Sequence, residues 1–199
     1  MIRLLAFILL LLPFSANAGA ARNDIKPVGE HYPIAIFEKS VNPQNILVIY
    51  TRLDGVCNLQ MDTKAPGMPT LDFYWLMNGR TYEPLTALEE GVRDRIKVEL
   101  DAAFAERTRS FRVVLNDLKA MRTDLPDVSA KVTAKADPKT RECSVDAVMR
   151  LGPSDGNAVI RLDSIYAKLG GFIIPSPVAI TLKGVNTVTG APVSRTYSK

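Results

Sequence analysis

The sequence predicts a mainly β protein, a single antiparallel β-sandwich or barrel of about nine or ten strands with one short helix. Apolar and polar residues alternate through most of the chain beyond residue 33, which is the pattern of strands with one buried face. Turn sequences rich in Asn, Asp, Gly and Pro separate the alternating runs at the short spacing of sandwiches and barrels. With no linker, internal repeat or low-complexity tract in the sequence, we expect one β domain over residues 34–199.

A signal peptide is expected before that domain, over residues 1–18. Arg3 provides a positive start, residues 4–14 form an apolar run, and Ala-Asn-Ala at 16–18 is a cleavage box of small residues. The apolar run is too short to span a bilayer, so we expect a cleaved signal and no membrane span after processing. The expected location is the bacterial periplasm, with secretion beyond the cell as an open alternative. Residues 19–33 are expected to form an N-terminal arm.

The strands follow in order along the domain, each an alternating run between two turns. The pair Asn78-Gly79, for example, favours a two-residue hairpin between two of them. The expected strands cover residues 34–37, 46–50, 71–77, 80–83, 96–100, 130–136, 145–151, 158–166, 178–182 and 193–197.

An aromatic run lies in the third of these strands. Because successive side chains of a strand point to opposite faces, Phe73 and Trp75 share a face with Leu71 and Met77. We expect that face to lie in the core, on a central strand. Tyr74 points the other way, and it is a candidate ligand- or partner-binding residue, since a small barrel can hold one apolar molecule.

One segment departs from the alternation and predicts the helix. Thr86-Ala87-Leu88-Glu89 has the form of a capping box, in which Thr86 is the N-cap and Glu89 reaches back to it. Leu88 and Val92 are spaced to share one helical face. The alternation returns from Ile96, so the helix is short.

The chain has two cysteines, Cys57 and Cys143. In an oxidising compartment an even pair favours a disulfide, and we expect these two to form one. Neither cysteine lies in a Cys-x-x-Cys pair, which makes a reactive thiol the weaker alternative.

Three stretches carry a resemblance to a known family. They are residues 36–50, with Phe37, Ser40 and Tyr50, then residues 73–77 with a Tyr-Trp pair, then residues 85–89 with Leu-Thr-x-x-Glu. Together they resemble a bacterial family of exported proteins catalogued only as a domain of unknown function. The resemblance spans roughly residues 34–197, and it implies an exported domain without implying an activity.

No catalytic residue, metal site or cofactor is predicted. His31 is the only histidine, and its position before the first strand predicts a solvent-facing loop residue. A nucleophile elbow of the form Gly-x-Ser-x-Gly is absent. Asp54, Asn58 and Asp62 lie in a Gly-containing loop, but they lack the alternate-residue spacing of a calcium loop and favour turn chemistry.

A second candidate binding element lies at residues 170–177, a run that lacks alternation and contains two prolines. Phe172, Ile173 and Ile174 within it are candidates for an exposed apolar patch that binds a ligand or partner. The alternative is a buried crossover loop.

Composition leaves a binding role as the leading hypothesis. The net charge of +4 is small, and no cluster of basic and aromatic residues indicates nucleic-acid binding. We expect a non-enzymatic periplasmic β domain that binds an unknown periplasmic protein or a small apolar ligand. The alternatives are an envelope enzyme whose carboxylates or hydroxyl assemble only in the fold, and a structural envelope factor. A cleft in which two acids converge would favour the enzyme, and an apolar cavity would favour binding.

Overall fold

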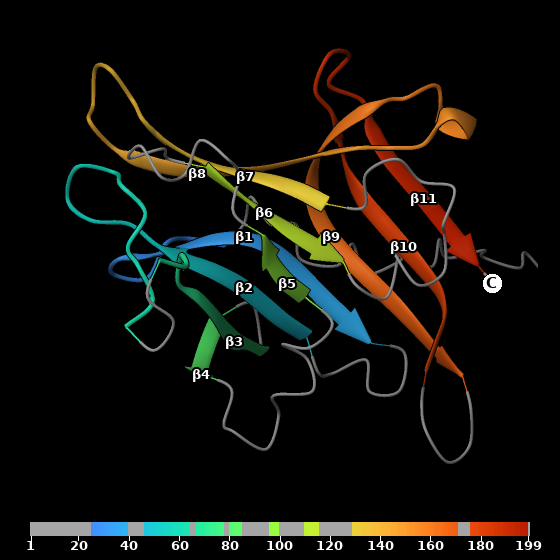
Figure 1. The fold of residues 1–199 in the computed structure, drawn as a ribbon, viewed down its shortest axis with the longest axis horizontal. Coiled ribbons are helices and arrows are strands. Elements are labelled where there is room, and N and C mark those ends of the chain that lie inside the picture. The colour runs from blue at the N-terminus through green and yellow to red at the C-terminus, as the bar shows by residue number, and fades with distance from the viewer. Residues whose placement is uncertain are drawn as a thin grey trace, which may run out of the picture.

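The structure is a computed structural model that describes residues 25–39, 46–63, 67–77, 80–84, 96–99, 110–115, 129–170 and 176–198. These residues form eleven strands, joined in one mixed sheet (Figure 1). The strands are β1 (His31–Lys39), β2 (Ile46–Arg52), β3 (Leu71–Met77), β4 (Arg80–Pro84), β5 (Ile96–Glu99), β6 (Ser110–Leu115), β7 (Ser129–Ala136), β8 (Cys143–Arg150), β9 (Val159–Gly170), β10 (Ser176–Asn186) and β11 (Pro192–Ser198). A single 3-10 turn, Pro153–Asp155, is the one helical element of the described residues.

The long strand β9 is the branch point of the sheet. β10 pairs with β9 along nearly its whole length and therefore occupies one of its two edges. The other edge is shared: β8 pairs with its first part, where Val148 lies opposite Arg161, and β1 pairs with its later part, where Ile36 lies opposite Ser164. Two arms of the sheet therefore separate along one edge of β9. We call β1 to β4 the first arm and β5 to β8 the second arm.

One main core connects both arms with β9, β10 and β11. Ile49 and Phe73 enter it from the first arm, Met149 from the second, Leu162 from β9 and Tyr197 from β11. Alternation places one face of β7 and one face of β8 in this core, as the pattern of their buried residues shows.

A bulge in β1 changes which of its residues face the main core. The register between β1 and β2 shifts between Pro33 and Ala35, and as a result Ile34 and Ala35 both lie in the main core. Ile36 lies on the opposite face of the first arm, where it forms a second buried cluster with Val48 and Tyr50.

The predicted β class is confirmed, together with the hairpin pairs that join neighbouring runs. Two features differ from the prediction, and the predicted helix is not tested. The β1–β9 pair is parallel, so the sheet is not wholly antiparallel. The described strands number eleven, and they form a sheet that is not closed, so neither a barrel nor a sandwich is confirmed. The predicted helix with Thr86 and Glu89 lies outside the described residues.

The side chains of strand β3 point to the two faces as predicted, but β3 does not lie at the centre of the sheet. Phe73 is buried in the main core, and Leu71 and Trp75 pack against it from the same face, whereas Tyr74 packs against the second cluster. Trp75 is only half-buried, because β3 is the second strand from the end of the first arm rather than a central strand. A near-edge strand has fewer neighbours to cover a side chain as large as indole.

Within the described ranges, no helix is long and apolar enough to cross a membrane.

Candidate functional site

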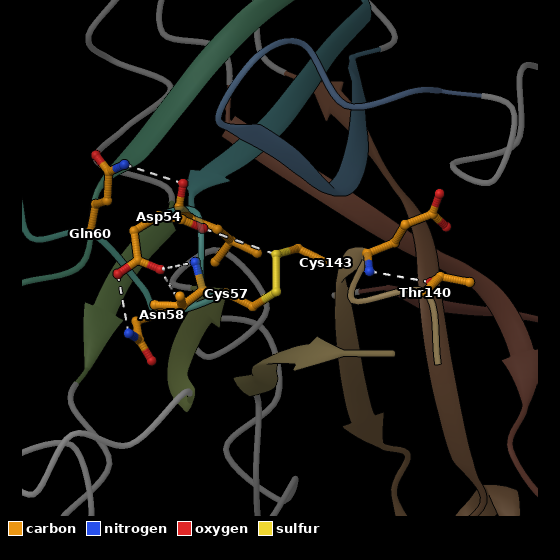
Figure 2. The surroundings of a disulfide bond; sticks show 9 residues. Asp54, Cys57, Asn58, Gln60, Thr140 and Cys143 are labelled. Carbon is orange, nitrogen blue, oxygen red and sulfur yellow. Dashed lines mark hydrogen bonds between the residues drawn. A yellow bond between two sulfur atoms is a disulfide. The ribbon is translucent and has the colours of Figure 1, made fainter. Parts of the chain in front are cut away.

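A disulfide joins the two arms of the sheet. Cys57 lies in the loop after β2 and Cys143 is the first residue of β8, and their sulfur atoms are bonded (Figure 2). The separation of 5.3 Å between the two Cα atoms lies within the usual range for a disulfide, and the predicted pairing is confirmed. The start of β8 is therefore held against the loop of the first arm.

The loop that carries Cys57 is shaped by Asp54. Its Oδ1 atom accepts hydrogen bonds from the backbone amides of Val56 at 3.0 Å and Asn58 at 2.8 Å, and its Oδ2 accepts one from the Asn58 side chain at 3.1 Å (Figure 2). These contacts favour the turn, in which Cys57 takes a positive φ of 63°. The Asp54 carboxylate acts in turn chemistry, as its sequence context predicts.

Beside the disulfide lies a hollow of about 290 Å³, which we call the fork pocket. It lies where β1 and β8 separate along β9, and the segment before β1 contributes to its wall. Its lining residues are Ile25, Pro27, Tyr32, Pro33, Cys143, Ser144, Val145, Asp146 and Arg161.

The fork pocket combines apolar walls with two charged side chains. Asp146 is paired with Lys135 of β7, at 2.7 Å between Oδ2 and Nζ. Arg161 comes from β9, and its Nε atom is buried without a hydrogen-bond acceptor among the described residues. A buried donor left without an acceptor typically costs about 1–3 kcal/mol. The pocket therefore holds one cation whose Nε–H finds no acceptor in the part of the chain that the structure describes.

A second hollow, of about 190 Å³, lies over β2, β3 and the loop between them. Two carboxylates line it, those of Asp62 and Asp72, together with the Arg52 guanidinium. Arg52 donates from Nε to Asp72 Oδ2 at 2.7 Å, and this bond raises the pKa of Arg52. We call this hollow the acid hollow. Here the cation and one of the acids already neutralise each other.

Tyr74 lies next to the acid hollow, in a group of three rings. Its ring meets those of Tyr50 and His31 edge to face, with centroids 5.2 and 5.3 Å away. Its hydroxyl lies 3.1 Å from His31 Nε2, which also lies 3.2 Å from Asp72 Oδ2. Burial raises the pKa of Tyr74, and the charge of Asp72 raises it further, so the hydroxyl stays protonated. Tyr74 is a structural hydrogen-bonding group here rather than an activated nucleophile.

The prediction that His31 is a solvent-facing loop residue is wrong. It is the first residue of β1, its side chain is 21% exposed, and its Nδ1 lies 3.2 Å from the carbonyl oxygen of Val28. The sequence context of a lone histidine does not reveal this, because the group that covers it comes from β3.

The other predicted binding residues, Phe172, Ile173 and Ile174, lie outside the described residues. Sequence reasoning missed the fork pocket. The one local signal for it is that Arg161 interrupts the apolar residues of a long strand, between the buried Ile160 and Leu162. That signal does not reveal which strands form the pocket, because β1 and β8 are distant in sequence.

Among the side chains that the structure describes, no three His, Cys, Asp or Glu residues gather as metal ligands. Comparison with known proteins finds no matching family model, no matching curated protein and no matching solved structure.

Proposed function

We propose that this chain is an exported, non-enzymatic β domain that binds a small, largely apolar molecule in the fork pocket. The observation that carries the proposal is the pocket itself: an open hollow lined by both apolar and polar residues, near the lower limit of the size range of ligand sites. Tyr32, Pro33 and Val145 offer apolar contact, and Ser144 and Arg161 offer hydrogen bonds.

The construction of the fork pocket favours a preformed site. Val145 is buried in the main core, and Cys143 is tethered by the disulfide. On the opposite wall, Pro33 is paired with Tyr50 of β2. A site built on paired strands loses little conformational entropy on binding, which favours affinity for a small ligand.

We also propose that the two arms pack as the layers of a sandwich around the main core, and that the domain acts in the periplasm. The core supports the first point, because it draws buried residues from both arms. The disulfide supports an oxidising compartment, and residues 1–18 have the form of a signal peptide. The resemblance to exported proteins of unknown function agrees with this location and stays a prediction.

Native mass spectrometry of protein purified from the periplasm tests the binding function. We expect a bound small molecule of defined mass. Ser144→Trp should lose it, because Ser144 is exposed and lines the pocket, so that an indole ring there fills the space without entering the core. Ser194→Trp is the matched control, at an exposed position on β11. Loss of the bound mass in both variants, or in neither, would contradict the assignment to this pocket.

The acid hollow favours a second candidate, an envelope enzyme. It brings two carboxylates to one hollow, with a histidine close by, which is the arrangement that acid–base chemistry requires. Against this, Asp72 is already held by Arg52.

Assays of the hydrolysis of 4-nitrophenyl esters and glycosides test whether the acid hollow is an enzyme active site. If it is correct, Asp62→Asn and Asp72→Asn abolish turnover, while Asp137→Asn, in the exposed turn before β8, leaves it unchanged. A protein that neither turns over these substrates nor carries a bound molecule would instead support a structural envelope factor.

A further inference from the structure

The position of Arg161 on β9 is firmly held. Its backbone lies between two partners, opposite Val148 of β8 and Val185 of β10. Gly184 of β10 approaches the Arg161 carbonyl so closely that a Cβ atom at residue 184 would overlap it. A guanidinium that starts from such a backbone has a restricted reach, and it lines the fork pocket.

The cations of the two hollows differ in one respect. Arg52 of the acid hollow donates from Nε to Asp72, whereas the Nε of Arg161 in the fork pocket has no hydrogen-bond acceptor among the described residues. Asp163 follows Arg161 by two residues on the same strand, and Asp146 also lines the pocket. Asp146 is engaged by Lys135. Arg161 is thus a half-buried cation at a pocket wall, with a buried Nε that has no described acceptor.

We propose that the molecule bound in the fork pocket carries a carboxylate, and that Arg161 is the group that recognises it; this inference rests on the proposed function of the pocket. A guanidinium presents its Nε–H and one terminal N–H side by side, at the spacing of the two oxygens of a carboxylate. The ligand supplies the acceptor that the described residues do not give to the Arg161 Nε–H. Its apolar part contacts Ile25, Pro27 and Tyr32.

The surroundings favour a carboxylate over a phosphate. A phosphate carries up to two negative charges and usually needs several donors, such as a group of backbone amides or more than one cation. The described lining offers one arginine and includes the negative Asp146. A carboxylate, which is planar and carries a single negative charge, is balanced by the single positive charge of Arg161.

The test uses two probes that share an apolar body, phenylacetate and 2-phenylethanol, and measures their affinity for the full-length processed protein by calorimetry. We expect phenylacetate to bind the wild type more tightly than 2-phenylethanol. Arg161→Gln should weaken phenylacetate by about tenfold or more, the effect of losing a charge-assisted hydrogen bond, and leave 2-phenylethanol unchanged. Arg150→Gln, on the exposed face of neighbouring β8, is the control and should change neither affinity.

Two further measurements keep the assignment falsifiable if Arg161→Gln fails to fold. The preference for phenylacetate is measured on the wild type alone. The Arg161 Nε–H resonance, observed by ¹⁵N NMR, should move on addition of phenylacetate and not of 2-phenylethanol. Equal affinity of the wild type for both probes overturns the role of Arg161 and leaves the pocket as a binding site. Failure of both probes to bind overturns the proposed function together with this inference.

Discussion

The Cα atoms of Cys57 and Cys143 lie 5.3 Å apart, although the two cysteines are 86 positions apart in the chain. The bond between them connects the loop after β2, in the first arm of the sheet, to the start of β8, in the second arm. It restrains the wall of the fork pocket as well as the fold, because Cys143 belongs to both.

We predict that replacing both cysteines by serine lowers the free energy of unfolding by about 2–5 kcal/mol. A loop of this length loses much conformational entropy when it is closed, and the unfolded state regains that entropy once the bond is removed. Chemical denaturation of the double variant measures the effect. Alkylation before and after reduction provides the control, since both thiols should react only after reduction. An unchanged denaturation midpoint would contradict the prediction.

Gly184→Ala should destabilise the domain, by about 1–3 kcal/mol or more. A Cβ atom at this position overlaps the carbonyl oxygen of Arg161, and the backbone of a paired strand cannot move aside without losing hydrogen bonds. Gly55→Ala is the matched control, because a Cβ there meets nothing within 4 Å. Melting temperatures of the two variants make the comparison, and equal values would show that β10 shifts freely over β9.

Phe73→Ala and Trp75→Ala should differ in their effects on stability. Phe73 is 2% exposed in the main core, so its truncation should cost about 3–5 kcal/mol. Trp75 shares that face but is half-buried, and we expect a smaller loss, about 1–3 kcal/mol. Denaturation of both variants tests the order. A Trp75→Ala protein that keeps its melting temperature but loses a bound molecule would instead place Trp75 in a ligand site.

The hydroxyl of Tyr74 should make stability depend on pH in the alkaline range. Its pKa is raised above 10.0 in the folded protein, so the native state holds this proton more tightly than the unfolded state. The resulting stability is fully present below the unfolded pKa and is lost as the pH rises through the folded pKa. We expect the melting temperature to fall above about pH 10. Tyr74→Phe should lower stability at pH 7 by about 0.5–1.5 kcal/mol, through loss of the contact with His31, and reduce the alkaline fall. An alkaline fall that is identical in the variant would contradict this account.

Much of the local structure is predictable because its determinants are close together in sequence. The alternation from Leu71 to Trp75 and the opposite orientation of Tyr74 follow from the pleat of a strand, whatever strands lie beside it. Antiparallel neighbours such as β10 and β11 are joined by a short turn, and strands that follow each other so closely in sequence usually pair with each other. The disulfide is predictable because the chain has only two cysteines to pair.

The sequence by itself therefore determined the β class, the hairpin pairs, the faces of β3 and the pairing of Cys57 with Cys143. Only the tertiary structure decided that β1 lies parallel to β9, that His31 is covered by β3, and that Arg161 lines a pocket between two arms of the sheet. The physical reason is that a period of two identifies which side of a strand is buried but not which distant strand buries it. That choice depends on the packing of the whole core, to which every strand contributes at once.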